Sequence, residues 1–331
     1  MKIFILASLF ILVNIAFAQT PDTITVETQR IKGFGPFPHS FGILQSMPSE
    51  SPWIKATPKI KGVPDSLSGL VLFVEQADFM QYTYQNYFAG NISEEHYNSC
   101  KKDWNWNPDS VEYTKDLVKV NIAIAAGYDR NGNLVILADR NNNYDLSDDE
   151  YYKVPAKIPG QDFWGRYNDL LPIIVKYEYY NGKEIKKDST WLYLDYGFIN
   201  YKTDKKDNPI QLSDVFAEHH LGEFNFDGKN YFIALRSDRA VFHNFYFVKV
   251  WEKDKDDQSN MEQGQQKGEL LKIGNYYFKI AKLSADGKHV TLVKESSVEQ
   301  KGGNQVGLKA LNISSKSISG KNIDLKNYHG K

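Results

Sequence analysis

The sequence has little of what marks many functional classes. Its 331 residues contain a single cysteine, Cys100, so no intramolecular disulfide can form. The 40 Lys and Arg residues nearly balance the 41 Asp and Glu residues, and the net charge of -1 creates no global field that would attract nucleic acid or an anionic membrane. Gly-rich phosphate loops, nucleophile elbows, HExxH motifs and CxxC motifs are missing from the sequence. We therefore expect no nucleic-acid partner, and no motif supports a hydrolase.

Histidine and cysteine also offer little for metal or thiol chemistry. His219 and His220 form the only adjacent histidine pair, and adjacent residues on a strand point to opposite faces. No cysteine or carboxylate joins them at ligand spacing. Cys100 has no companion histidine motif, so we expect it to be a small buried hydrophobe and not a nucleophile.

The chain has one long apolar run, and it lies at the N-terminus. Residues 1–18 combine Lys2, apolar residues from Ile3 to Ile15 and the small-residue site Ala16-Phe17-Ala18, which is the pattern of a secretory signal peptide. Position 19 is Gln and not Cys, which argues against a lipid anchor. We expect an exported protein, periplasmic or secreted, without a transmembrane helix once the signal is removed.

The composition favours a β-rich body. Hydrophobic residues make up 41% of the chain, enough for a large core, and 21 Tyr and 19 Phe beside Gly and Asn clusters favour strands over helices. We predict a mainly β, antiparallel, sandwich-like body over residues 19–300, and we allow a division into two domains near 155–170. Residues 19–64 mix Pro and Gly with short strand candidates, which indicates an irregular or edge-strand lead-in.

Several apolar segments have the length and pattern of strands. Residues 120–125 alternate as a half-buried strand does, and residues 133–138 return after a DRNGN turn. Two segments share the same kind of hairpin pattern without being a true repeat. NGNLVILADR and DGKNYFIALRSDR both run from a turn through an apolar strand to Asp-Arg. Residues 252–268 are polar and predict a solvated loop. The other predicted strands are 69–75, 173–180, 190–196, 231–235, 245–251, 276–283 and 289–293.

One short helix is predicted near 93–104. Ser93 is a good N-cap residue, and Glu94 and Glu95 suit the first turn of the helix. Trp104 and Trp106 follow in DWNWNPD. Aromatic faces beside amide side chains suit glycans, so these tryptophans are candidate ligand-binding residues, but alternating tryptophans before an Asn-Pro turn also fill core edges. Both interpretations stay open.

The segment Asp139 to Glu150, DRNNNYDLSDDE, carries oxygen-bearing side chains at every second position. Its spacing resembles a calcium-binding loop, because calcium needs six to eight oxygen ligands from a short segment. Tyr144 stands where such a loop needs Gly, and a strand precedes the segment in place of a helix. An Asn-rich turn held by its own hydrogen bonds is the alternative. The candidate ligands are Asp139, Asn141, Asn143, Asp145 and Glu150.

Residues 305–331 differ in character from the body. They resemble the opening of a thioredoxin-like domain of the TlpA and redoxin type, with the pattern VGxxAPxFxxxxxxGxxxxLxxxxGK. Leu311 replaces the usual Pro and Ile313 the usual Phe. The body is similar, through GNISEEHY, VILADRNNNYDLSDDE and FKIAKLSADGKHVTL, to the N-terminal extension of exported TlpA-like proteins of Bacteroidetes type. The matching residues of the C-terminal segment are Val306, Gly307, Ala310, Gly320, Leu325, Gly330 and Lys331.

The resemblance implies a thiol-disulfide oxidoreductase family in which a CxxC active site follows this opening. Cys100 matches no family position and has no CxxC partner. We therefore expect residues 305–331 to be the truncated start of a thioredoxin-like domain, and the chain to be inactive alone. The expected role is an accessory one, in which the body positions the redox domain or binds a client protein. The alternative is a free-standing module that binds a glycan or a protein, with no required cofactor but with calcium as an option.

Overall fold

The structure is a computed structural model. It describes residues 21–47, 52–153, 170–196, 210–243, 245–255 and 264–295, and the short pieces 302–303, 309–310 and 314–324. The predicted signal peptide and the predicted domain division near 155–170 lie outside the described residues. The described chain is mainly β and its sheets are antiparallel except for one short pair, which confirms the predicted fold class.

Two sheets that contain the first and the last strands of the described body pack face to face, and we call this pair the terminal sandwich. The first sheet has the order β1-β17-β16-β15, with bounds Thr23–Glu27, His289–Lys294, Tyr276–Leu283 and Leu271–Ile273. The second has the order β14-β13-β12-β11-β2, with bounds Gln265–Gln266, Tyr246–Glu252, Lys229–Ser237, Glu218–Phe226 and Gln29–Lys32. Their facing apolar side chains form one core that includes Val26, Leu235, Val248 and Leu292.

Two further sheets form the central sandwich. One has the order β3-β10-β9-β8, with bounds Gly42–Ile43, Leu212–Phe216, Ile185–Tyr196 and Ile173–Tyr180. The other has the order β4-β5-β6-β7, with bounds Ser68–Gln76, Asn121–Tyr128, Leu134–Ala138 and Tyr152–Lys153. Ile124, Ile136, Val175 and Leu192 belong to the core between them. This core takes residues from both sides of the undescribed segment 154–169.

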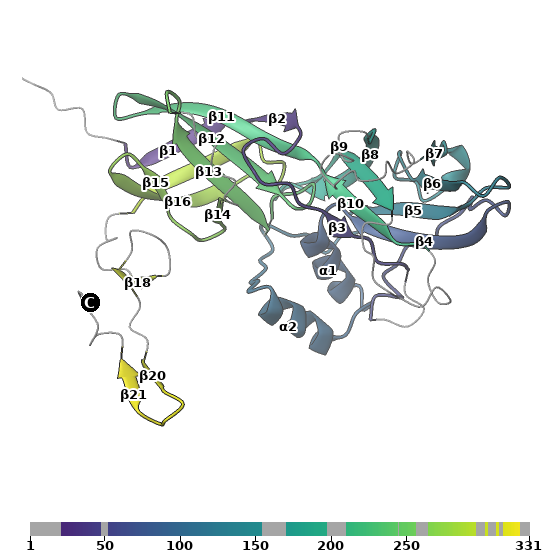
Figure 1. Ribbon diagram of the computed structural model, residues 1–331, viewed down its shortest axis with the longest axis horizontal. Coiled ribbons are helices and arrows are strands. Elements are labelled where there is room, and N and C mark those ends of the chain that lie inside the picture. The colour runs from purple at the N-terminus through teal and green to yellow at the C-terminus, as the bar shows by residue number, and fades with distance from the viewer. Residues whose placement is uncertain are drawn as a thin grey trace, which may run out of the picture.

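The chain visits the four sheets in a nested order. On the way in it adds one strand, β1, β2 or β3, to each of three sheets, and it then builds the whole of the fourth, innermost sheet with β4 to β7. It returns through the other three sheets with β8 to β17 (Figure 1). The strands β1, β2 and β3 each lie at an edge of their sheet. Of the two predicted alternatives for the N-terminal lead-in, irregular structure or edge strands, its strands are edge strands.

The strand β5 departs from its predicted half-buried character. Every residue from Asn121 to Gly127 is buried, so the prediction of one exposed face was wrong. Ala125 packs with Leu137 and Leu146 in a second small cluster, which Ile60 and Leu67 also contact. The acidic loop and the segment 60–67, which precedes β4, therefore cover the face of β5 that the alternation predicted to be exposed.

Two helices lie together beside the central sandwich (Figure 1). Helix α2 (Glu94–Asp103) is the predicted one, and Ser93 caps it by accepting the backbone N–H of His96 at 3.2 Å. Helix α1 (Phe79–Phe88) was not predicted; Asp78 caps it by accepting the N–H of Gln81 at 3.0 Å. The two helices are joined by the rings of Tyr87 and Tyr97, which stack 4.1 Å apart at 2°.

The remaining elements are short. A 3-10 turn, η1, covers Leu146–Asp148 within the acidic loop. The polar segment 252–268 contains the two-residue strand β14 in its described part, so the prediction of a loop there was incomplete. Beyond the body, β18 (Gly302–Gly303) pairs with β19 (Lys309–Ala310), and β20 (Ser314–Lys316) pairs with β21 (Asn322–Asp324) as a hairpin.

Candidate functional site

Asp139 follows the end of β6 and anchors the acidic loop. Its side chain is fully buried, and its two carboxylate oxygens accept the backbone N–H of Asn143 at 3.1 Å and of Tyr144 at 2.8 Å. Tyr144 takes a φ of +62°, the left-handed conformation for which a calcium loop normally uses Gly at this position. The backbone therefore turns where a calcium loop turns, with a tyrosine in the place of glycine.

The side chains that follow close a series of small turns. Asn141 Oδ1 accepts the N–H of Asn143 at 3.1 Å, and Asn143 Oδ1 accepts the N–H of Asp145 at 2.7 Å. Asp145 Oδ1 in turn accepts the N–H of Ser147 at 3.1 Å. The two asparagine amides also donate to Asp148 Oδ2 at 2.9 and 3.0 Å. Four of the five predicted ligands, all but Glu150, thus already accept hydrogen bonds from the loop's own backbone.

Glu150, the predicted bidentate ligand, is turned toward solvent. Its side chain is 84% exposed, and its Oε2 lies 3.3 Å from Nη1 of Arg140. Asp139, the first predicted ligand, is by contrast 0% exposed. Within the part of the chain that the structure describes, no group of three or more His, Cys, Asp or Glu side chains is arranged to hold a metal ion.

The two candidate tryptophans have different environments at the end of α2. Trp106 is only 4% exposed, and its ring meets those of Tyr97 at 5.8 Å and Tyr113 at 5.4 Å, both edge to face. Trp104 is half-buried and contacts the ring of Phe79 at 4.8 Å. Trp106 is therefore part of an aromatic core, whereas Trp104 packs against the edge of that core and stays partly exposed.

A cavity of about 570 Å³ opens beside these tryptophans. One wall is the turn after α2, with Trp104, Asn105 and Asn107. The opposite wall comes from β13 and β14, with Phe245 preceding β13 and Gln266 in β14. The volume lies within the range of about 300–1,000 Å³ that is typical of small-ligand sites. The structure thus joins the predicted tryptophans to residues that are distant in sequence.

Cys100 lies on α2 and is buried with 5% of its surface exposed. Burial raises the pKa of its thiol, and the nearby carboxylate of Asp103 acts in the same direction. Its sulfur lies 3.7 Å from Nε2 of His96, one turn earlier on the helix. A reactive cysteine needs a lowered pKa and access to its partner, so this thiol is suited to packing.

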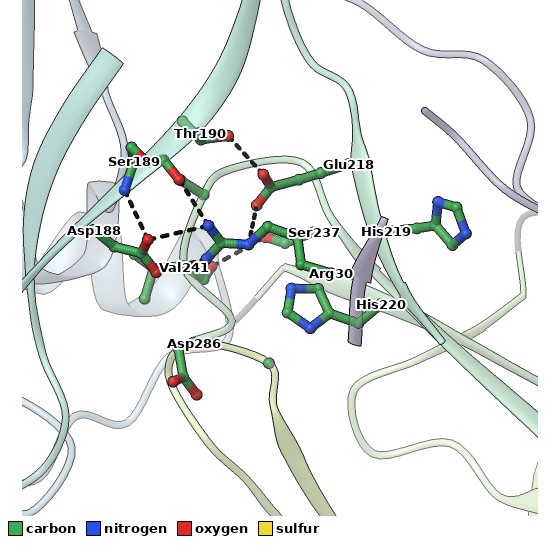
Figure 2. Close-up of polar contacts among 12 residues, drawn as sticks. Arg30, Asp188, Ser189, Thr190, Glu218, His219, His220, Ser237, Val241 and Asp286 are labelled. Carbon is green, nitrogen blue, oxygen red and sulfur yellow. Dashed lines mark hydrogen bonds and ion pairs between the residues drawn. The ribbon is translucent and has the colours of Figure 1, made fainter. Parts of the chain in front are cut away.

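A partly buried charged cluster, missed by the sequence reasoning, joins the two sandwiches (Figure 2). Arg30 of β2 binds the carboxylate of Asp188 of β9 through two bonds of 3.1 and 2.6 Å, and it donates to the carbonyl of Ser189 at 2.7 Å. Glu218 of β11 lies 3.6 Å from Arg30 Nε and accepts the Thr190 hydroxyl at 2.8 Å. The cluster is a polar joint between the terminal and central sandwiches.

Burial governs the protonation of this cluster. It raises the pKa of Glu218 from 4.5 to about 7, although Arg30 and Thr190 act in the opposite direction.

The two neighbouring histidines point to opposite sides of β11, as the sequence predicts (Figure 2). His219 Nδ1 lies 2.8 Å from the carbonyl of Gly33, and His220 Nδ1 lies 3.2 Å from the Thr28 hydroxyl. Burial lowers the pKa of His220 to about 4, so this ring is neutral near pH 7.

A second set of buried charges surrounds the segment between β12 and β13. The Arg239 guanidinium forms an ion pair with Glu75 at the end of β4, and its Nη1 lies 3.9 Å from Asp214 of β10. Burial raises the pKa of Asp214 to about 7 and lowers that of Arg239 to about 10. A cavity of about 250 Å³ lies against Asp214, Arg239 and Asp238.

The same segment holds a histidine-aspartate pair. His243 Nδ1 lies 2.8 Å from Asp78 Oδ2, and both side chains are buried. Asp78, His243 and Ser237 together line a further, small cavity. The hydroxyl of Ser237 donates within this group to backbone carbonyls, since it lies 3.0 Å from those of Val241 and Phe245. The cavity measures about 10 Å³, room for at most one water molecule. Asp78 also caps α1, so its pair with His243 has a structural role at the start of that helix.

One signal in the sequence pointed to these charges. Asp139-Arg140 and Asp238-Arg239 are the Asp-Arg pairs that end the two similar strand segments. Both pairs lie where a strand leaves its sheet and enters a polar environment. Partners as distant in sequence as Arg30 and Asp188 have no such local signal, because only the nested topology brings them together.

No helix in the described ranges is long and apolar enough to cross a membrane. No protein-family model, curated protein or solved structure matches the chain.

Proposed function

We propose that this chain is the β-rich, non-catalytic part of an exported thiol-disulfide oxidoreductase of the TlpA type, where it positions the redox domain or binds its client protein. The observation that carries the proposal is the hairpin of β20 and β21, which lies in the segment that resembles the opening of a thioredoxin-like domain.

The hairpin is folded but stands apart from the body (Figure 1). Its turn is closed by the N–H of Gly320, which donates to the carbonyl of Ser317 at 2.8 Å, and Gly320 takes a φ of +77°. The side chain of Ile318 is fully exposed, and every residue of β20 is exposed as well. An isolated two-stranded hairpin is marginally stable in water, so these residues support the proposal of a missing sheet on which the hairpin packs.

The thiol chemistry of such a protein has to come from outside this sequence. Dithiol exchange needs a thiolate with a lowered pKa and a resolving cysteine within reach. Cys100 is buried, its pKa is raised and it is the only cysteine of the chain. The role proposed for the chain is consequently accessory.

An insulin-reduction assay tests this proposal on two proteins, the natural product purified from its source and the 331-residue chain. We expect the natural product to reduce insulin disulfides and the 331-residue chain to be inactive. Cys100→Ala in the chain serves as the control and should change nothing. Reduction by the chain that disappears in Cys100→Ala would refute the accessory role.

Export of the protein is part of the proposal. The support is the pattern of residues 1–18, and cleavage after Ala18 would leave Gln19 as the first residue. Peptide mass mapping of the natural protein should find the N-terminal peptide starting at Gln19. A peptide that starts at Met1 would contradict removal of a signal.

Glycan binding is the second candidate function. The specific support is the cavity beside Trp104, because a half-buried aromatic ring and several side-chain amides line it together. Trp104→Ala should weaken retention on a polysaccharide column while the free energy of unfolding changes little. A large loss of stability with no change in retention would assign Trp104 to the core.

We propose further that the acidic loop folds without calcium. Four of its five predicted ligands, all but Glu150, already accept backbone N–H groups. The amide of Asn142 also donates to the carbonyls of Lys119 at 3.0 Å and Lys176 at 3.0 Å. Thermal unfolding in EDTA and in millimolar calcium should give the same Tm. A Tm that rises with calcium concentration would show that the folded loop binds the ion.

A further inference from the structure

The cavity beside Trp104 carries an excess of negative charge. Three carboxylates line it, from Asp109, Glu112 and Asp238, against one lining cation, Lys267. The ammonium of Lys267 donates to the carbonyl of His243 at 3.1 Å. A guanidinium nitrogen of Arg236 lies 3.8 Å from Asp238 and offsets part of its charge. The lining residues therefore favour a neutral or cationic ligand.

The carboxylates differ in how far they are already engaged. Asp109 Oδ1 accepts the backbone N–H groups of Val111 at 2.8 Å and Glu112 at 2.9 Å, which fixes its orientation. Glu112 is exposed, and across the described residues no hydrogen bond or ion pair involves its carboxylate. Its charge nevertheless acts on the cavity, because together with burial it raises the pKa of Tyr246 to about 12. Glu112 is thus the carboxylate best placed to bind a cation.

Aromatic surface and amides complete the lining. Trp104 is half-buried and Phe245 is 43% exposed, so both leave ring surface toward the cavity. The C–H bonds of a sugar ring and an ammonium group are both attracted to the negative face of an aromatic ring. Asn105, Asn107 and Gln266 add donors and acceptors that suit hydroxyl groups.

We propose that this cavity binds a saccharide with free amino groups, of the glucosamine type, and this inference rests on the glycan-binding function proposed above. The ring would pack on Trp104 while an ammonium group pairs with Glu112. A peptide is the less suitable ligand, because strand addition needs a long free edge and the edge strand beside the cavity, β14, has only two residues.

Calorimetric titration of the 331-residue chain with four probes tests the inference. The probes are a glucosamine tetramer, its N-acetylated form, cellotetraose and tetralysine. We expect the glucosamine tetramer to bind on the order of tenfold more tightly than the two neutral tetramers, and its affinity to fall with salt. Tetralysine should bind more weakly than any of the three saccharides.

Two variants locate the binding. Glu112→Gln should remove the preference for the glucosamine tetramer and leave binding of the neutral tetramers unchanged. Glu184→Gln, at an exposed carboxylate of the turn between β8 and β9, is the matched control and should change no affinity. Trp104→Ala should weaken all three saccharides. Circular dichroism confirms that each variant is folded.

The outcomes separate this inference from the glycan-binding function. Equal affinity for the glucosamine and N-acetylated tetramers would overturn the amino-sugar inference and keep glycan binding. Failure of all three saccharides to bind would overturn both. Tightest binding of tetralysine would assign the cavity to a basic peptide and would also overturn the inference.

Discussion

Replacement of Arg30 by methionine tests the joint between the two sandwiches. The side chain of Arg30 is 16% exposed and makes two bonds to Asp188, one to the carbonyl of Ser189 and a contact of 3.6 Å to Glu218. Methionine keeps most of the apolar volume but leaves the half-buried carboxylate of Asp188 and the buried carboxylate of Glu218 without their cation. Removal of one partner from a buried ion pair costs about 3–5 kcal/mol.

Urea unfolding at pH 7.5 and pH 5 measures this effect, with equal m-values as the condition for comparing free energies. The free energy of unfolding that Arg30→Met removes should be smaller at pH 5 than at pH 7.5. The reason is that Glu218 is protonated below about pH 7, and a neutral carboxyl group is not stabilised by the charge of the guanidinium. Lys253→Met is the control, since Lys253 pairs with Glu223 at 2.8 Å on the surface with side chains 42% and 44% exposed. We expect the control to cost less than about 1 kcal/mol. If Arg30→Met lowers the free energy of unfolding no more than the control does, the claim that the Arg30 cluster stabilises the contact between the two sandwiches is refuted.

Two further substitutions test the pH response and the aromatic core. Burial raises the pKa of Glu218 from 4.5 to about 7, so the folded chain holds a proton that the unfolded chain releases between these pH values, and this stabilisation is lost as the pH rises through 7. Glu218→Gln should remove it, so wild-type stability relative to the variant should fall by roughly 3 kcal/mol between pH 4.5 and 7 in urea titrations; a difference independent of pH would contradict the shift. Trp106→Ala should cost about 3–5 kcal/mol in the same assay, because Trp106 is 4% exposed, and a cost below about 1 kcal/mol would place it outside the core.

Local signals in the sequence were sufficient for α2 and for the strands that were predicted, but they did not predict β10 and β11. Ser93 caps α2 as predicted, and β16 has the predicted bounds Tyr276–Leu283. Each of these elements depends on its own residues, through a cap or through alternation within a strand. The edge position of the N-terminal strands also followed from local Pro and Gly content.

The failures have a common cause in tertiary contacts. The sequence of α1, FMQYTYQNYF, is rich in aromatic residues that favour strands, and burial of most of its residues overrides that propensity. The amides of Gln81 and Gln85 donate to the carbonyls of Thr114 at 2.7 Å and Val118 at 3.1 Å, partners 33 residues away in each case. The full burial of β5 likewise depends on a loop that packs over it.

The candidate site was predictable only in part. DWNWNPD indicated Trp104 and Trp106, but the opposite wall comes from β13 and β14, more than a hundred residues later. The acidic loop was located correctly, whereas the outward direction of Glu150, which pairs with Arg140 at the surface, was not predicted. The direction of a side chain, and the residues that line a cavity from a distant part of the sequence, can be known only once the folded topology is known.

The intact mass of the natural protein, purified from its source, tests the central claim most directly. The 331-residue chain has a mass of 38.0 kDa. The proposal that the β-rich body carries a thioredoxin-like domain predicts a mass well above this value. A mass slightly below 38.0 kDa, as removal of residues 1–18 alone would give, would contradict the claim and leave the β-rich body as the whole mature protein.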